Sequence, residues 1–173
     1  IVGEPTNGRA NPGGFIGVAG GFAVFVSGGS PKNPITGKNW EGTGVLPDIA
    51  VASAEALDRA QDLALQRLLA TAQGPAAAEL RWLLADRQAP AVRIDPSAYV
   101  GSYGAEANVT AENGTLVLNR GRRATPLRPV AADVFVSTLD PLMHARFERQ
   151  GGRVTALTLA TPDGPIARFT RGA

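Results

Sequence analysis

The sequence has 173 residues, 44% hydrophobic and 18% charged, a composition typical of a folded protein with one domain or two small ones. The net charge of +2 is not gathered into a dense basic cluster, and no apolar run approaches about 20 residues, so we expect neither a nucleic-acid partner nor a membrane span. The sequence contains no cysteine and a single histidine, so we expect no disulfide, no thiol catalysis, and no metal or other cofactor.

Residues 1–52 are rich in glycine and in strand-forming residues. Ile1 and Val2 predict the end of a short buried strand, and residues 22–26 predict an apolar strand that a turn closes. Residues 45–51 are predicted to be extended, with Pro47 at a strand start or an edge. Apolar strands of this kind need a covering partner, so on their own we expect them to self-associate, for instance as a homodimer.

Two helices are expected next. Residues 53–72 have Ser53 as a plausible N-cap and apolar side chains at helical spacing, namely Leu57, Ala60, Ala64 and Leu68. Gly74 and Pro75 end this helix, and Pro75 suits the first turn of a second helix over residues 75–88. Residues 89–96 follow as a linker.

The remaining residues, 97–173, predict short strands separated by turns. The strongest signal is Asn113-Gly114, which predicts a type I′ hairpin because both turn residues need positive φ. Further strands are expected over residues 125–130, 134–137, 145–149, 154–159 and 166–170. The pattern predicts an antiparallel β-meander that curls into a small barrel.

Two carboxylates lie in glycine-rich, otherwise apolar loops. Glu4 and Glu41 could each orient a histidine, as the acid of a catalytic triad does, or could hold the loop's shape through hydrogen bonds to its amides. His144, the only histidine, lies in a predicted strand far along the chain from these loops, so we expect it to be structural. From residue chemistry alone, the sequence contains no complete active site.

Two phrases of the sequence carry a family resemblance. Val2-Gly-Glu-Pro-Thr6 and then Asn33-Pro-Ile-Thr-Gly-Lys-Asn-Trp-Glu-Gly42, continued by Gly44-Val-Leu-Pro-Asp48, precede a helix. This order resembles the tail-specific (C-terminal processing) serine peptidases, in the branch similar to the tricorn core and interphotoreceptor retinol-binding protein. It covers residues 1 to about 72. A weaker resemblance, at Tyr99-Val-Gly-Ser-Tyr103, is to a small all-β domain appended to such peptidases.

The resemblance implies an α+β fold: the C-terminal part of a crotonase/ClpP-like peptidase core over residues 1–73, a helix and linker over 74–96, and a small all-β accessory domain over 97–173. It also implies the C-terminal portion of a serine endopeptidase acting on peptide or protein substrates. The nucleophilic serine and the base histidine would lie upstream of Ile1, so the chain alone is expected to be inactive. The family further implies a bacterial protein of the periplasm or the extracellular space.

Two residues acquire roles from this resemblance. Glu41 matches the relay carboxylate of the tricorn-like branch, which reaches the histidine through an intervening serine. Arg9 stands where the other branch carries a dyad lysine, and a guanidinium cannot serve as general base near neutral pH. We therefore expect Glu41 to be catalytic and Arg9 to contact a substrate carboxylate. The alternative is a non-catalytic binding or structural module for a hydrophobic ligand or a protein partner.

Overall fold

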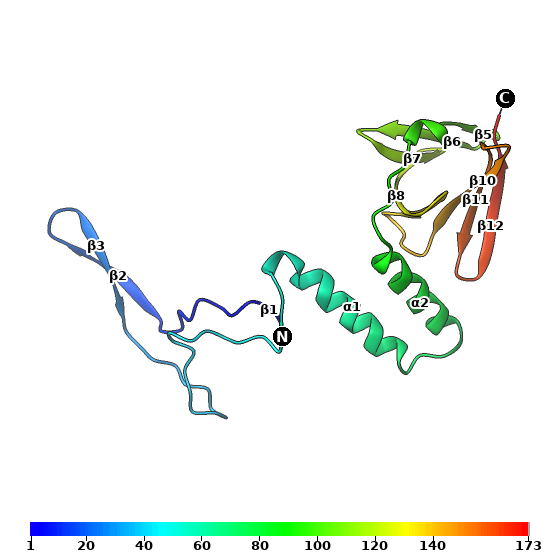
Figure 1. Ribbon diagram of the computed structural model, residues 1–173. Coiled ribbons are helices and arrows are strands. Elements are labelled where there is room, and N and C mark those ends of the chain that lie inside the picture. Colours follow the sequence, from blue (N-terminus) through cyan, green and yellow to red (C-terminus); the bar gives the residue numbers. More distant parts are fainter. Residues whose placement is uncertain (173) are drawn as a thin grey trace. The chain divides into compact units, whose positions relative to one another are not determined.

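The computed structural model describes residues 1–172, which divide into two compact units, one over Ile1–Leu63 and one that begins at Ala64 (Figure 1). The boundary falls within helix α1 (Ala56–Leu69), which the short 3-10 helix η1 (Ser53–Glu55) precedes. The two units are described separately below.

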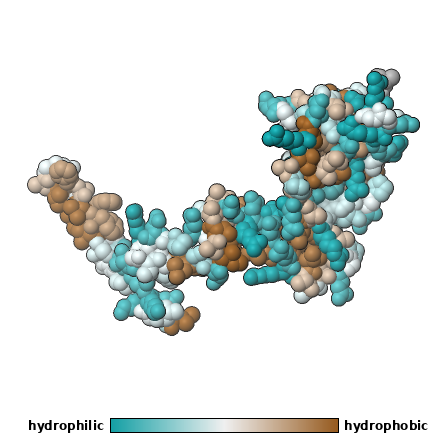
Figure 2. Space-filling view, in the orientation of Figure 1, coloured by the Kyte–Doolittle hydropathy of each residue, from teal (hydrophilic) through white to brown (hydrophobic). Residues whose placement is uncertain are grey.

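The first unit contains two separate two-stranded sheets. Strand β1 (Val2–Gly3) pairs in parallel with β4 (Ile49–Ala50), and β2 (Gly13–Val18) forms an antiparallel hairpin with β3 (Phe22–Ser27). Every residue of the hairpin is exposed, and Phe15 and Phe22 are 78% and 72% exposed. Figure 2 shows the hairpin as an apolar surface. This unit therefore has no hydrophobic core of its own among the residues described.

The expected α+β class, with part of a crotonase/ClpP-like core, is wrong. Strands predominate in the described residues, the α-helices number two, and an eight-stranded antiparallel sheet is the main structure. The segments assigned to the peptidase core form strands of only two residues and a hairpin with no further strand beside it. The physical reason is that their apolar side chains are not buried against one another, so no layered sheet-and-helix core is formed.

In the second unit, helix α2 (Gly74–Gln88) follows the last turns of α1. Gly74 has a φ of +58°, which separates α2 from α1, and Pro75 lies in the first turn of α2, where its missing N–H has no cost. A second 3-10 helix, η2 (Pro96–Ala98), follows, and the Asp95 side chain caps it by accepting from the Ser97 backbone N–H.

Eight strands then form one antiparallel sheet in simple sequential order. They are β5 (Gly101–Tyr103), β6 (Ala107–Glu112), β7 (Thr115–Arg120), β8 (Arg123–Ala131), β9 (Val134–Ser137), β10 (His144–Gln150), β11 (Arg153–Thr161) and β12 (Gly164–Thr170). A bridge between Tyr103 and Arg171 brings the two edges together, so the sheet is a nearly closed barrel. The barrel-like domain predicted for the C-terminal part is confirmed.

The barrel interior is the hydrophobic core of the protein. Its largest fully buried side chains come from nearly every strand, namely Tyr103, Val109, Leu116, Leu118, Leu127, Phe135, Leu157 and Leu159. Tyr99 packs edge-to-face on Phe135 and Phe147, with ring centroids 5.0 and 4.9 Å apart. The alternation of buried and less buried residues along β6 and β8 indicates which of their side chains face this core.

Candidate functional site

The first candidate site is the loop pair that carries Glu41. Its Oε2 accepts hydrogen bonds from the backbone N–H groups of Ala10 and Asn11, each at 2.8 Å. The Gly42 N–H also donates to the Gly8 carbonyl at 2.8 Å, which ties the second glycine-rich phrase to the first. The two phrases that carry the family resemblance therefore lie side by side, and Glu41 joins them.

A glycine is required where these loops touch. Gly44 has a φ of +71°, and a Cβ at this position would lie 1.9 Å from the Thr6 carbonyl oxygen. The Thr6 side chain then accepts from the Val45 N–H at 2.8 Å. Only a residue without a side chain permits this approach, so Gly44 sets the position of the loop that presents Glu41.

Arg9 and Glu41 line the same pocket, a cavity of about 600 Å³ that Phe15 and Phe25 also border. Both charged side chains are exposed. Within the described residues, the Arg9 side chain makes no hydrogen bond or ion pair, and both hydrogen bonds of the Glu41 carboxylate go to Oε2, which leaves Oε1 available. The pocket therefore combines the Arg9 cation, the Glu41 carboxylate and the apolar rings of Phe15 and Phe25. Such a combination can bind a peptide with a charged end.

The other polar residues of this region are engaged locally. Glu4 accepts a hydrogen bond from the Ser53 hydroxyl, so its carboxylate holds the start of η1. The Ser27 hydroxyl lies in the same pocket as Glu41 but donates to the carbonyls of Pro12 and Gly29. The sequence has one histidine, and it belongs to the second unit.

His144 is part of a buried cluster on the outer face of the barrel. Its Nε2 lies 2.6 Å from Oδ2 of Asp86, and the two side chains are only 8% and 10% exposed. The ring of Trp82 stacks on the imidazole, with centroids 4.0 Å apart. The Arg128 guanidinium donates to the Asp86 carbonyl at 3.2 Å. These contacts attach helix α2 to β8 and β10.

Sequence reasoning missed Asp86 as the partner of His144. The available signal was the spacing of Trp82 and Asp86, which lie four residues apart and hence on one face of α2. Two buried nitrogens of this cluster, Nδ1 of His144 and Nε1 of Trp82, have no hydrogen-bond partner among the described residues. The imidazole is enclosed, so this cluster holds α2 in place and does not present a base to a substrate.

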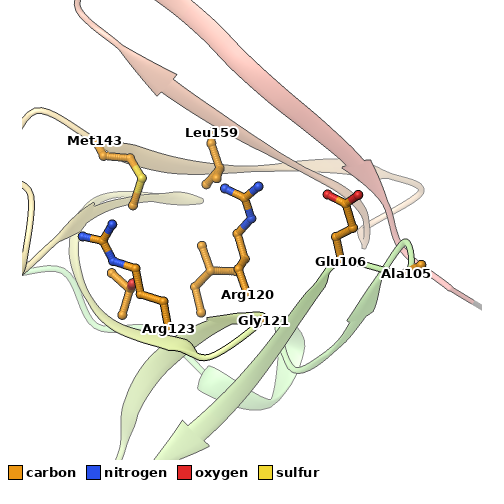
Figure 3. A pocket seen from close by; sticks show the side chains of 9 residues that line it. Ala105, Glu106, Arg120, Gly121, Arg123, Met143 and Leu159 are labelled. Atoms are coloured by element: carbon orange, nitrogen blue, oxygen red, sulfur yellow. The ribbon is translucent and has the colours of Figure 1, made fainter.

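A pocket of about 590 Å³ lies at one end of the barrel (Figure 3). The lining residues come from the turn between β5 and β6, from the β7–β8 hairpin, from the loop before β10 and from β11: Ala105, Glu106, Leu118, Arg120, Gly121, Arg123, Thr125, Met143 and Leu159. Arg122, in the turn between β7 and β8, is not one of the lining residues.

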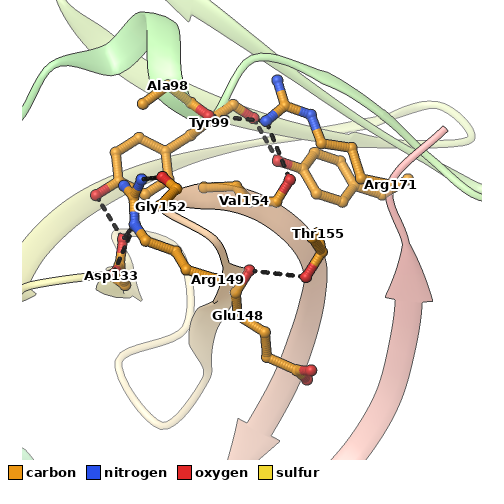
Figure 4. Close-up of polar contacts among 10 residues, drawn as sticks. Ala98, Tyr99, Asp133, Glu148, Arg149, Gly152, Val154, Thr155 and Arg171 are labelled. Atoms are coloured by element: carbon orange, nitrogen blue, oxygen red, sulfur yellow. Dashed lines mark hydrogen bonds and ion pairs between the residues drawn. The ribbon is translucent and has the colours of Figure 1, made fainter. Parts of the chain in front are cut away.

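A network of polar contacts stabilises another part of the barrel (Figure 4). The Tyr99 hydroxyl donates to Asp133 at 2.8 Å, and the Arg149 guanidinium donates to both oxygens of the same carboxylate at 2.9 and 3.0 Å. Burial, and then the Asp133 hydrogen bond, raise the pKa of Tyr99, and Asp133 also raises the pKa of Arg149. Arg171 donates to the carbonyls of Ala98 and Val100. Because these groups pair with one another, we regard the network as structural.

Two further findings concern ligands and membranes. Across residues 1–172, no group of three or more histidine, aspartate or glutamate side chains is placed to hold a metal ion. None of the helices in that range is both long enough and apolar enough to cross a bilayer.

Comparisons with known proteins identify no family. No family model matches the sequence, and no curated protein or solved structure gives a significant match.

Proposed function

We propose that the chain is the C-terminal portion of a serine endopeptidase, with Glu41 as the carboxylate that steadies the base. The serine would attack the peptide carbonyl while the histidine takes its proton and passes it to the leaving amine, and water would then hydrolyse the acyl-enzyme. Both groups would come from a part of the protein outside this sequence. On the motif resemblance, the enzyme would act in the bacterial periplasm or outside the cell.

The observation that carries this proposal is the way Glu41 is held. Two backbone N–H groups fix Oε2 at 2.8 Å, and Oε1 is left at the rim of a pocket that Arg9 shares. A carboxylate fixed in this way can orient an imidazole or a bridging hydroxyl. Arg9 would contact a carboxylate of the substrate through its planar fork.

The test is peptide hydrolysis by the full-length protein with Glu41→Gln and Glu41→Ala. The amide oxygen of glutamine can still accept from Ala10 and Asn11, so Glu41→Gln keeps the loop but removes the charge. If Glu41 steadies the base, both variants lower kcat, on the order of 10²–10⁴-fold. If Glu41 only holds the loop, Glu41→Gln retains full activity and the catalytic role is overturned.

The 173-residue chain supplies a second measurement. It should not hydrolyse a generic peptide, because its only histidine is enclosed against Asp86. Hydrolysis by this chain that a serine-directed reagent abolishes would contradict the placement of the nucleophile outside it.

A second candidate function is binding of a hydrophobic ligand by the barrel. The observation that favours it is the pocket at the barrel end, which has Leu118, Met143 and Leu159 in its wall. Small barrels of about eight strands can enclose one small ligand.

A further inference from the structure

The two arginines of the barrel pocket belong to the core-facing side of their strands. On β7, Leu116 and Leu118 are 1% and 2% exposed, and the two-residue period places Arg120 on the same face. On β8, Thr125 and Leu127 are 4% and 1% exposed, and the same period places Arg123 with them. Both arginines are therefore the last core-facing residues at the barrel mouth.

The register makes this pair electrostatically unfavourable. Arg120 and Arg123 are direct partners across the β7–β8 hairpin. Like charges directly opposite each other on neighbouring strands destabilise the pairing. Neither guanidinium makes an ion pair or hydrogen bond with a carboxylate among the residues that the structure describes. Arg120 lies over the ring of Phe169, 5.1 Å from its centroid, and this contact holds its charge in place without neutralising it.

The rest of the pocket is largely apolar. Figure 3 shows both guanidinium groups extending toward Met143 and Leu159, and Leu159 is fully buried. Two arginines and one carboxylate, Glu106, are the charged residues of the lining, so the pocket has a net positive charge. A cavity of about 590 Å³ is within the usual range for small-molecule sites.

We infer that this pocket binds a single-chain amphiphile with a carboxylate head group. The carboxylate accepts hydrogen bonds from Arg120 and Arg123 and relieves their mutual repulsion, and the alkyl chain lies over Met143, the large apolar lining residue that is partly exposed. A planar guanidinium matches a carboxylate in geometry and can donate two parallel N–H hydrogen bonds to it. The two arginines together can therefore donate four. The inference names a ligand class for the second candidate function and is independent of the peptidase proposal.

Decanoate, 1-decanol and acetate test this inference by isothermal titration calorimetry on the 173-residue chain. Decanoate is expected to bind at least about tenfold more tightly than 1-decanol, which lacks the charge, and than acetate, which lacks the chain. Equal affinity for decanoate and 1-decanol would overturn the head-group assignment. Equal affinity for decanoate and acetate would show an anion site without a place for the alkyl chain, and would also overturn the inference.

Variants of the β7–β8 hairpin locate the binding. The double substitution Arg120→Gln/Arg123→Gln should weaken decanoate binding at least about tenfold, whereas Arg122→Gln, the matched control outside the pocket, should leave it unchanged. The substitution Arg120→Glu/Arg123→Glu should reverse the preference, from decanoate to decylammonium. If Arg122→Gln weakened decanoate binding as much as the double substitution does, the effect would be one of nonspecific charge and would contradict the site.

Met143 supplies a local readout, because it is the only methionine in the sequence. A ¹³C-methyl label on Met143 should show a saturable shift with decanoate, which separates pocket binding from binding to the exposed β2–β3 hairpin. A thermal melt of each variant shows that the barrel is folded. Saturable calorimetric binding without a Met143 shift would overturn the placement, and none of these outcomes affects the Glu41 assay.

Discussion

At the scale of single residues, neighbours decide what a polar side chain does. Glu41 is exposed and accepts two backbone N–H groups, whereas Asp86 is buried against an imidazole. From the sequence, Glu41 attracted a functional hypothesis and Asp86 did not. Asp86 and His144 are 58 residues apart, so no local pattern could have paired them. The catalytic role of Glu41 and the substrate contact of Arg9 stay predictions.

Tyr103 gives a residue-scale prediction about stability and pH. Its hydroxyl donates to the Tyr99 carbonyl at 2.6 Å, so Tyr103→Phe should lower the free energy of unfolding by about 1 kcal/mol at neutral pH. Burial also raises the pKa of Tyr103 above its ordinary value of 10.0. A raised pKa in the folded state adds to the free energy of unfolding. This contribution is complete below pH 10 and is lost as the pH rises through the pKa of the folded state.

Urea unfolding of both proteins at pH 7 and at pH 11 measures these effects. The wild type should lose more stability between the two pH values than Tyr103→Phe does, because the variant has one fewer phenol to ionise. Tyr99 also has a raised pKa, so part of the alkaline loss should persist in the variant. An equal alkaline loss in both proteins would contradict the role assigned to Tyr103.

At the scale of elements, short-range patterns were informative where they specify local geometry. The two helices were predicted from their apolar spacing and from Gly74-Pro75, and they occur at Ala56–Leu69 and Gly74–Gln88. The Asn113-Gly114 turn has positive φ at both residues, 49° and 80°. It joins β6 to β7 between the paired residues Glu112 and Thr115. Such signals depend on a few adjacent residues and need no knowledge of the fold.

The same hairpin supplies an element-scale prediction. Gly114→Ala should lower the free energy of unfolding by about 1 kcal/mol, because an L-residue is disfavoured at a φ of +80°. No atom lies within 4 Å of a Cβ built at this position, so the cost is in the backbone and not in packing. Asn113→Gly is the matched control and should be nearly neutral, since glycine suits a type I′ turn. Chemical denaturation measures both, and equal destabilisation by the two substitutions would contradict this account.

At the scale of the whole molecule, apolar surface is distributed unequally between the units. The barrel unit contains the buried core, whereas the exposed large hydrophobic residues of the β2–β3 hairpin include Phe15, Phe22 and Phe25, each at least 50% exposed. Contiguous exposed apolar surface is typical of interaction sites. A hairpin with no further strand beside it also offers two free edges to another chain.

We therefore predict that the chain self-associates through β2 and β3. Sedimentation velocity over a range of concentrations should show dimers or larger species for the wild type. Phe15→Ser/Phe25→Ser should weaken the association, because it removes two rings that pack together at 5.5 Å on the exposed hairpin. Ile166→Ser, an exposed position on β12, is the control and should have no effect. A wild type that is monomeric at every concentration would contradict the prediction.

The sequence by itself determined the elements whose signals are local: the presence of the two helices, the tight turns and the alternation that produces a small barrel. It did not determine how residues 1–52 fold, because their glycine-rich segments have no alternating or helical pattern that specifies a partner. Only the tertiary structure joined the two glycine-rich phrases through Glu41, paired Asp86 with His144 and set Arg120 opposite Arg123 at the barrel mouth. These features depend on loop closure, helix docking and strand register, which arise when distant segments pack together.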